Sequence, residues 1–461
     1  MQASSRRWNR EKGAMIIQAA VASIAFLALA ALAVDWGVKL IARGEAQRAA
    51  DAGALAGAIS LAFDASPGTS VDLTEAGLAK RNAHGFAVVN TVFGQAPVVD
   101  IKDDVTFPEC PAPDGGPGTT CVQVDVYRND EGGNPLPTFF SRIVGVRNQG
   151  VKATATAKVL TGTQTECLRP WVVIDRWDEF GPIQFPAADP EWCPGGACGA
   201  PSTYDKYSDG KGQAPPQEND SYVPPATDGS SPGTGFRVLG TPNDIGRQFA
   251  LKVQTNDGIT PGWGLAVDLP RADTNNLGAS AYGDNILSCN RKTVSINDPV
   301  ANPCPTDANQ LNSWAQQVAW AEKGCLRVQT GTMQGPTSSN VGDLVARDSG
   351  AQWGWNPQTS AYGVINSAFP ESPRIVPVAI LDIDKYLAQN PTGSGGVISV
   401  VNMFGFFIEG MGDYNDKDGS IEIKNGGKAV IGRLVKISAS GRGTTKLHDA
   451  SAFSKIIVLV R

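Results

Sequence analysis

The sequence predicts an α+β protein with a long N-terminal transmembrane and stalk helix, a small membrane-proximal α+β unit, and a larger β-rich distal domain whose sheet is mostly antiparallel. An apolar run from Ala14 to Val34, continued at helical spacing to Phe63, predicts the helix. Short alternating runs such as Cys121–Tyr127 are typical of strands. With 52 Gly and 31 Pro among 461 residues and 18% charged residues, the composition indicates many turns and more than one folded unit.

The apolar run has the length of a membrane span. It is interrupted only by Gln18 and Ser23. At a rise of about 1.5 Å per residue it would cover about 31 Å, which is close to the thickness of the hydrocarbon core of a bilayer. Residues 1–12 carry four basic side chains and one acidic side chain, and positively charged flanks stay in the cytoplasm. We therefore expect an uncleaved anchor at 13–34 with a cytoplasmic N-terminus.

Two other fates of this run stay open. The stretch from Ala31 to Ala33 fits the cleavage site of a secretory signal, although the run is longer than the usual apolar region of a signal and helical spacing continues past it. Pilin-type subunits are processed at a position that corresponds to Gly13-Ala14, and they carry Glu at the fifth residue after the cut. This chain has Gln18 at that position, which cannot neutralise an amine, so pilin-type processing is disfavoured.

The cysteines indicate disulfides outside the cytoplasm. There are eight of them with only two histidines, and no Cys-x-x-Cys pair of the kind that zinc sites use. Strand-like runs flank the loop between Cys110 and Cys121 and would bring the two sulfurs together. The remaining connectivity does not follow from sequence alone. We expect the pairs Cys110–Cys121, Cys193–Cys198, Cys289–Cys304 and Cys167–Cys325.

Small residues form one face of the stalk helix. They are Ala46, Ala50, Gly53 and Gly57, at spacings of three and four. Such a face could receive a second helix, but we favour packing of the helix on its own domain. A second helix should begin near Asp72, which forms a capping box with Glu75, and end at Gly85. Beyond it we expect a short amphipathic helix at Pro137–Val146 and a strand at Gly150–Leu160.

The distal part is expected to be a β core with a few helices. Its run Val397–Glu409 is apolar on both faces, which predicts a central strand that is covered twice. Other expected strands are Phe249–Thr255, Trp263–Leu269, Ile375–Asp382, Ala429–Ala439 and Lys455–Val460, and the expected helical segments are Asp307–Lys323 and Ser338–Asp348.

These elements predict the following organisation: a cytoplasmic tail (1–12), a transmembrane helix (13–34), its extension as a stalk (35–65), a membrane-proximal α+β domain (66–161), and a β-rich distal domain (162–461) that contains a long Pro/Gly-rich loop (178–235).

An acidic loop at 412–419 is the candidate calcium site. Its possible ligands are Asp413, Asn415, Asp416 and Asp418. Counted from Asp413, its glycine falls one place later than in an EF-hand. We favour a solvated turn between strands, and we expect no cofactor.

Two stretches in the first third of the chain carry a family resemblance. They are Leu32-Ala-Val-Asp35-x-Gly37 and Gln47-x-Ala-Ala-Asp51-Ala-Gly-Ala-Leu-Ala56, followed in order by AKRNAHGF, PTFFSRIVGV and VKATATAKV. This order resembles the TadG-like proteins of the Tad (tight adherence, Flp pilus) assembly family. The resemblance implies a protein of the bacterial inner membrane whose N-terminus is cytoplasmic and whose C-terminal domains are periplasmic. It also implies other pilus-assembly subunits as partners.

Some TadG-like proteins carry a von Willebrand A domain, whose metal site needs Asp-x-Ser-x-Ser after a strand. The corresponding residue here is Asp175, and the segment Asp175–Glu179 contains no serine. We therefore expect no metal site of that kind.

The predicted function is a membrane-anchored, non-catalytic component of a Tad/Flp-type pilus assembly or adhesion system. The alternative is a secreted or surface-displayed, adhesin-like module that binds carbohydrate or a surface. The tryptophans Trp353, Trp355, Trp171 and Trp177 could supply stacking, although such rings more often fill the periphery of β domains. An enzyme is not expected, since no catalytic constellation can be named. A net charge of −6 without a basic block disfavours nucleic acid as a partner, and no small-molecule substrate is identified.

Overall fold

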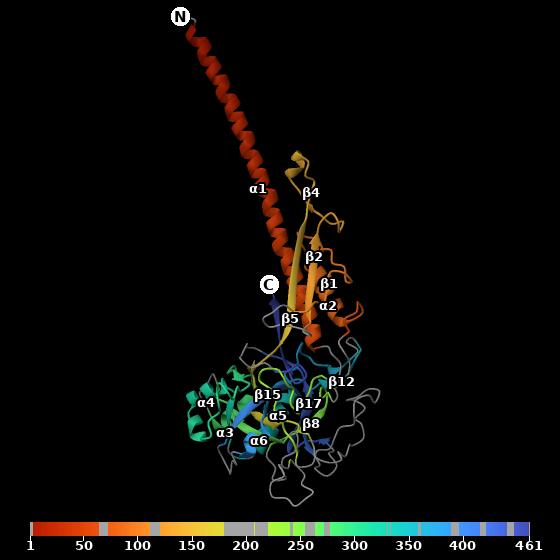
Figure 1. The fold of residues 1–461 in the computed structure, drawn as a ribbon, viewed down its shortest axis with the longest axis vertical. Helices are drawn as coiled ribbons and strands as arrows, with labels where there is room; N and C mark the ends of the chain where they lie inside the picture. The colour runs from red at the N-terminus through yellow and green to blue at the C-terminus, as the bar shows by residue number, and fades with distance from the viewer. Residues whose placement is uncertain are drawn as a thin grey trace, which may run out of the picture. The chain divides into compact units, whose positions relative to one another are not determined.

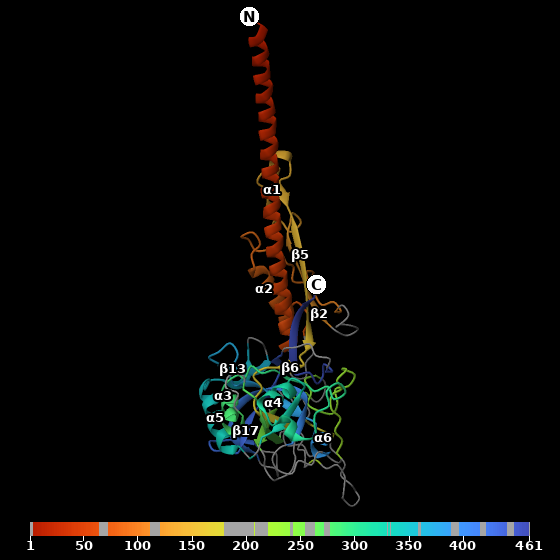
Figure 2. The same ribbon diagram turned by 90° about the vertical axis from the view of Figure 1, so that its left-hand side faces the viewer.

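The computed structural model divides the chain into two compact units, which are described separately. The first unit holds Met1–Ala62, Val71–Val159 and Ile457–Arg461, and the second holds Phe63–Ser70 and Leu160–Ile456. Figures 1 and 2 show the elements of each unit. The structure describes residues 3–63, 72–110, 120–178, 207, 220–239, 243–253, 263–271, 277–329, 331, 333–357, 361–388, 396–414, 421–439 and 447–460.

Helix α1 extends over Ala3–Phe63, a stretch of 61 residues that contains no proline and many alanines, which have the highest helix propensity. Most large apolar side chains from Met15 to Ile41 are exposed. By its length and composition, the helix is able to cross a membrane. From Ala42 onward its small side chains are buried, so the two halves of α1 have different surroundings.

The first unit packs α1 and α2 (Leu78–Val89) on a sheet. The strand order is β1 (Val105–Thr106), β2 (Cys121–Arg128), β5 (Val151–Thr161) and β19 (Ser454–Val460). β2 and β5 are antiparallel, with Val124 opposite Ala155. Alternate residues of β5 are buried from Val151 to Ala157, as expected of a strand with one face on a core. The core therefore consists mainly of alanines from the helices and valines from the strands.

The last strand of this sheet comes from the C-terminus. We expected it as Lys455–Val460 within the distal domain, but its residues from Ile457 group with the first unit. At its start, Ser454 and Lys455 pair in parallel with β18 (Ile437–Ser438) of the second unit. Strand pairing across hundreds of residues leaves no local signal, and the sequence alone therefore did not reveal where this strand belongs.

Two expectations for the first unit are corrected in detail. The predicted helix at Pro137–Val146 is only a 3-10 turn, η1 (Ser141–Val144), which Gly145 ends at a φ of 91°. Paired strands β3 (Leu136–Pro137) and β4 (Asn148–Gln149) enclose the turn, so too few residues remain for a helix. Helix α2 begins at Leu78 rather than at Asp72, because the Asp72 carboxylate accepts a local bond from the N–H of Thr74 at 2.8 Å.

The second unit is organised around one large sheet. Its strands lie in the order β11 (Cys325–Val328), β15 (Val397–Tyr414), β14 (Ile375–Leu381), β7 (Trp171–Ile174), β9 (Trp263–Asp268), β8 (Gln248–Val253) and β17 (Ala429–Val435). β17 also pairs with β15, which closes the sheet on itself. Most pairs are antiparallel, with parallel pairs at β14–β7 and β8–β9.

Strand β15 is the central strand that the sequence predicted. Its residues from Val397 to Ile408 are all buried. Phe404 and Phe406 join one core cluster, whereas Ile398 and Val400 join another, so both faces of the strand are covered. α3 (Gly278–Leu287) and α5 (Gln334–Ala346) contribute side chains to the first cluster, and α4 (Trp314–Ala321) contributes to the second.

The remaining elements of the second unit are short. They are β6 (Gln164–Thr165), β10 (Val294–Ser295), η2 (Ala308–Leu311), α6 (Ile383–Ala388), β16 (Ile421–Ile423) and a hairpin of β12 (Gln352–Asn356) and β13 (Ala361–Ile365). The predicted class is thus confirmed as a mixed α+β chain with a long N-terminal apolar helix and a β-rich C-terminal part.

Candidate functional site

A single carboxylate connects α1 to the turn at 138–147. The Asp35 side chain accepts hydrogen bonds from the N–H groups of Phe139 (2.8 Å), Phe140 (3.1 Å) and Ser141 (2.6 Å), and from the Ser141 hydroxyl (2.5 Å). We call this set of bonds the Asp35 clasp. The hydroxyl of Ser141 and these N–H groups stabilise the charged form and, against the opposing effect of burial, lower the pKa of Asp35 to about 2.

The turn itself is closed by a buried threonine. Thr138 Oγ1 donates to the carbonyls of Val146 and Arg147, both at 2.8 Å. Phe139 and Phe140 follow it directly and are exposed. Figure 1 shows this turn beside α1, above β4 and β5. The clasp was not predicted, because nothing near Asp35 in the sequence identifies its partners; its position directly after the apolar run was the one available signal.

The small face of the stalk packs on its own unit, as we favoured. Ala46 and Ala50 are fully buried in the core of the first unit. A Cβ at Gly53 would lie 2.8 Å from the Ala83 carbonyl oxygen, and one at Gly57 would lie 2.8 Å from Val122 Cγ1. Glycine is therefore required for close approach of the helix to α2 and β2.

Two polar residues of the resemblance stretches lie at the edge of this packing. Gln47 Nε2 donates to Asp51 Oδ1 at 2.9 Å and to the carbonyl of Thr154 at 3.2 Å. Together with Leu459 and Val460 they line a hollow of about 360 Å³. Gln47 thus bonds the stalk to β5, six residues before Gly53.

In the second unit, Asp175 lies where two parallel strands end. Ile174 pairs with Leu381, so Asp175 and Asp382 follow adjacent strands at the same edge of the sheet. Ligands of open α/β sheets often bind at such edges. Here the Asp175 carboxylate accepts bonds from the N–H of Phe236 at 2.8 Å and from the hydroxyl of Tyr222 at 3.3 Å. A Cβ at Gly235 would lie 2.1 Å from it, so protein atoms fill the space around the carboxylate.

Burial raises the pKa of Asp175 to about 7, against the opposing effect of its backbone hydrogen bonds. The carboxylate is fully enclosed, and its role is to hold the segment that contains Phe236. Over the described parts of the chain, no three His, Cys, Asp or Glu side chains gather in a way that could hold a metal ion.

Of the four calcium candidates, Asp413 lies among the described residues. Asp413 belongs to β15, where its carboxylate pairs with Lys424 at 2.6 Å and accepts the N–H of Lys428 at 3.0 Å. The hydrogen bond from Lys424 lowers the pKa of Asp413. Asn415, Asp416 and Asp418 lie outside the described residues. Asp413 is therefore already neutralised by a lysine of the same hairpin.

A second hollow, of about 550 Å³, lies beside the hairpin of β12 and β13. Its lining includes Trp355 and Phe369, which are both exposed, and the polar Asn366 and Glu371. Trp353, by contrast, is buried at the core. Trp171 and Trp177 are buried as well, so Trp355 is the accessible one of the four tryptophans that we considered for stacking.

One serine has the spacing of a nucleophile but not its surroundings. Ser231 is the central residue of the stretch Gly229–Gly233, which fits the Gly-x-Ser-x-Gly pattern of nucleophile elbows. Those elbows join a strand to a helix, whereas this stretch is a loop in which Ser231 Oγ accepts the N–H of Gly233 at 3.2 Å. We therefore assign no catalytic role to Ser231 from this pattern.

Three disulfides lie among the described residues. Cys110–Cys121 is confirmed, whereas the pairs are Cys167–Cys289 and Cys304–Cys325, so the expected Cys289–Cys304 and Cys167–Cys325 are wrong. Cys193 and Cys198 lie outside the described residues.

Contacts distant in sequence decide the two corrected pairs. The N–H of Cys167 donates to the Asn290 carbonyl at 2.8 Å, beside the antiparallel pair β6–β10, which brings Cys167 to Cys289. Asn297 Nδ2 donates to the carbonyls of Asn302 and Lys323, which brings Cys304 to Cys325.

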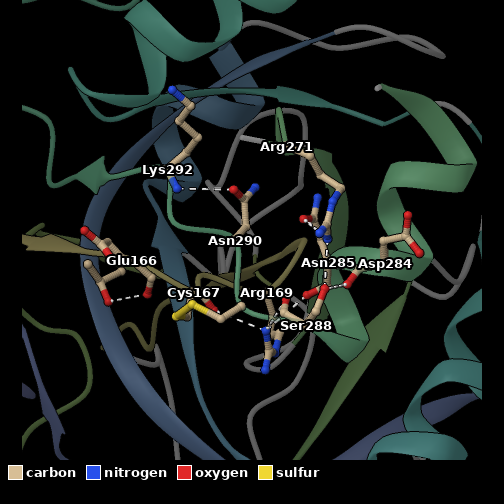
Figure 3. The surroundings of a disulfide bond; sticks show 11 residues. Glu166, Cys167, Arg169, Arg271, Asp284, Asn285, Ser288, Asn290 and Lys292 are labelled. Carbon is tan, nitrogen blue, oxygen red and sulfur yellow. Dashed lines mark hydrogen bonds between the residues drawn. A yellow bond between two sulfur atoms is a disulfide. The ribbon is translucent and has the colours of Figure 1, made fainter. Parts of the chain in front are cut away.

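Two arginines surround the Cys167–Cys289 disulfide (Figure 3). Arg169 donates to the carbonyls of Asn285 (3.2 Å) and Ser288 (3.1 Å) at the C-terminal end of α3, where a positive charge is favourable. Arg271 donates to the hydroxyl of Ser288 at 3.0 Å. Burial, with a smaller effect from Arg347, lowers the pKa of Arg169 to about 10. Arg169 binds backbone carbonyls and Arg271 binds the side chains of Asn285 and Ser288, so the role of both arginines is structural.

Comparison with protein-family models, with curated proteins and with solved structures finds no match to this chain.

Proposed function

We propose that this chain is a membrane-anchored, non-catalytic component of a Tad/Flp-type pilus assembly or adhesion system. In this proposal the apolar part of α1 spans the bacterial inner membrane, the N-terminus is cytoplasmic, and both folded units lie in the periplasm. Other pilus-assembly subunits are the partners. The disulfides support an extracytoplasmic location, since disulfides persist in oxidising compartments.

The observation that carries the proposal is the role of the stretches that resemble TadG-like proteins. Asp35 makes the clasp, Gln47 bonds to Thr154, and Gly53 allows close approach to Ala83. These residues are spread along one helix and join it to the turn at 138–147, to β5 and to α2 of the first unit. The stretches thus specify a structural module directly after an apolar helix, which is the architecture that a membrane-anchored assembly component needs.

The buried polar groups of the second unit support a non-catalytic role in the same way. Arg374 donates to the carbonyls of Asp348 (2.9 Å), Ala351 (2.8 Å) and Ile408 (2.8 Å). Asp175 accepts the N–H of Phe236. Backbone groups form hydrogen bonds with both side chains. These side chains therefore hold the fold rather than face a substrate.

A deletion strain of the source bacterium tests the proposal. We expect loss of surface pili on electron micrographs, restoration by the complete chain, and recovery of that chain in the inner-membrane fraction after alkaline extraction, with its cysteines oxidised. A mature N-terminus at Val34 in the culture medium, or full piliation of the deletion strain, would contradict the proposal.

The second candidate function is an adhesin-like module that binds carbohydrate, and the hollow beside β12 and β13 favours it. Exposed Trp355 and Phe369 with nearby Asn366 and Glu371 combine apolar faces with polar groups, as sugar sites do. Glycan arrays with the detergent-solubilised full chain test it. Binding that is lost in Trp355→Ala but kept in Trp36→Ala, an exposed tryptophan of α1, would support this candidate; no binding to any glycan would exclude it.

A further inference from the structure

The turn at 138–147 presents an apolar surface that the first unit does not cover. Phe139 is 52% exposed, Phe140 44% and Val146 48%. On α1, Trp36 is 60% exposed, so the neighbouring helix segment is apolar on its outside as well. We call Trp36, Phe139, Phe140 and Val146 the apolar turn surface. Two adjacent exposed phenylalanines are unusual in a unit whose core is made of alanine and valine.

The clasp fixes the depth of this surface relative to the apolar part of α1. Asp35 follows directly after the run that ends at Val34. A span at 13–34 fills the hydrocarbon core, and the headgroup layer adds about 5–8 Å on each side, which corresponds to about four or five helical residues. Residues 35–39 then lie among the headgroups. Because the N–H groups of Phe139 and Ser141 lie within 2.8 Å of the Asp35 carboxylate, the turn lies there too.

The basic side chains around the apolar turn surface also fit a position among lipid headgroups. Arg142 and Arg147 are exposed on the turn, and Lys39 and Arg43 follow on α1. Basic side chains beside an apolar edge attract the phosphates of lipid headgroups. A protein partner would have to reach a surface that directly adjoins the end of the membrane span. The continuity between the exposed part of α1 and this turn therefore identifies lipid as the occupant.

We propose that the apolar turn surface is a second membrane contact, in which Phe139 and Phe140 insert at the boundary between headgroups and acyl chains while Asp35 holds the turn in place. This inference rests on the proposed function, because it requires that α1 spans a membrane. The second contact would fix the tilt and rotation of the first unit on the membrane, which a single helix cannot do.

Photocrosslinking of the full chain in nanodiscs tests the proposal. The nanodiscs contain phosphatidylcholine and phosphatidylglycerol, and p-benzoylphenylalanine replaces Phe139 or Phe140 in separate variants. Leu27, in the apolar run, serves as the reference for lipid, and Phe86, an exposed phenylalanine of α2, as the matched control. We expect lipid adducts by mass spectrometry at both turn positions at a level approaching that of Leu27→p-benzoylphenylalanine, and several-fold above Phe86→p-benzoylphenylalanine.

The outcomes separate this inference from the proposed function. Adducts at position 27 without adducts at 139 and 140 overturn the second contact and leave the anchor intact. The absence of adducts at all positions overturns the anchor and with it the proposed function. Crosslinks from 139 or 140 to a second copy of the chain would overturn lipid as the occupant. Asp35→Asn should lower the adducts at position 139 several-fold but not those at position 27, and an oxidised Cys110–Cys121 pair verifies that each variant is folded.

Discussion

The carboxylate of Asp35 accepts both the N–H and the hydroxyl of Ser141, a residue 106 positions further along the chain. One side chain at the end of the apolar run thus fixes the turn of the sheet domain that follows. Because the bonds go to backbone N–H groups, they define the path of the turn and do not depend on the identity of its side chains, apart from Ser141.

The clasp predicts a pH dependence. The folded pKa of Asp35 is about 2, below its ordinary value of 3.8. The stability that the Asp35 carboxylate contributes to the first unit is therefore complete above about pH 4 and is lost as the pH falls through about 2. The thermal midpoint of the full chain in detergent should fall between pH 4.5 and about 2.5 by more than that of Asp35→Asn. Equal losses in the two proteins would show that the clasp does not stabilise the unit.

The close helix packing predicts opposite effects of the same substitution at two glycines. Gly53→Ala adds a methyl group 2.9 Å from Ala87 Cβ and 2.8 Å from a backbone oxygen, so it should destabilise the first unit by about 1–3 kcal/mol. Gly44→Ala meets nothing within 4 Å and should stabilise α1 by up to about 1 kcal/mol. Urea unfolding midpoints measure both. A neutral Gly53→Ala would mean that α1 stands further from α2.

The buried Asp175 predicts that the stability of the second unit decreases as the pH rises, the opposite of the effect of Asp35. Its folded pKa is raised to about 7, so between about pH 4 and 7 the folded state binds a proton that the unfolded state has released. Stability of the second unit should therefore be highest below about pH 4 and should decrease as the pH rises through about 7, by at most about 4 kcal/mol in total. Asp175→Asn should remove this slope in unfolding experiments between pH 5 and about 8; an unchanged slope would assign it to other groups.

The end of α3 depends on Arg169. Arg169→Met leaves the buried carbonyl of Asn285 and the partly buried carbonyl of Ser288 without that donor and should lower the free energy of unfolding by about 1–3 kcal/mol. Arg291→Met, at an exposed position nearby in sequence, should change stability by less than about 0.5 kcal/mol. Denaturant unfolding compares the two. An equal loss of unfolding free energy in the two variants would show that the hydrogen bonds of Arg169 do not stabilise the end of α3.

The disulfide connectivity can be checked directly. Peptide mapping without reduction should recover Cys167 linked to Cys289 and Cys304 linked to Cys325. Replacing both Cys167 and Cys289 by alanine should cost about 2–5 kcal/mol, since the bridge closes a long loop. A peptide that links Cys289 to Cys304 would contradict the fold around β10.

Features with a local signal were predictable from the sequence. The apolar run, the doubly buried β15 and the alternating β2 and β5 all follow from periodicity, because burial repeats at the spacing of the element. Features that depend on partners distant in the sequence were not predictable from it. The pairing of Cys167, the place of β19 and the donors to Asp35 are each decided by residues more than 100 positions away. The helix predicted at Pro137–Val146 was wrong, since ten residues can match helical spacing without forming a helix.

The C-terminal strand has a consequence for the order of biosynthesis. β19 borders β5 in the sheet of the first unit, yet its residues from Ile457 are synthesised after the whole second unit. The edge of β5 therefore stays unpaired until the whole second unit has been synthesised. An unpaired strand edge is a site of aggregation and proteolysis. A chain that lacks β19 would keep that edge exposed, so the pairing of β19 protects the edge of β5.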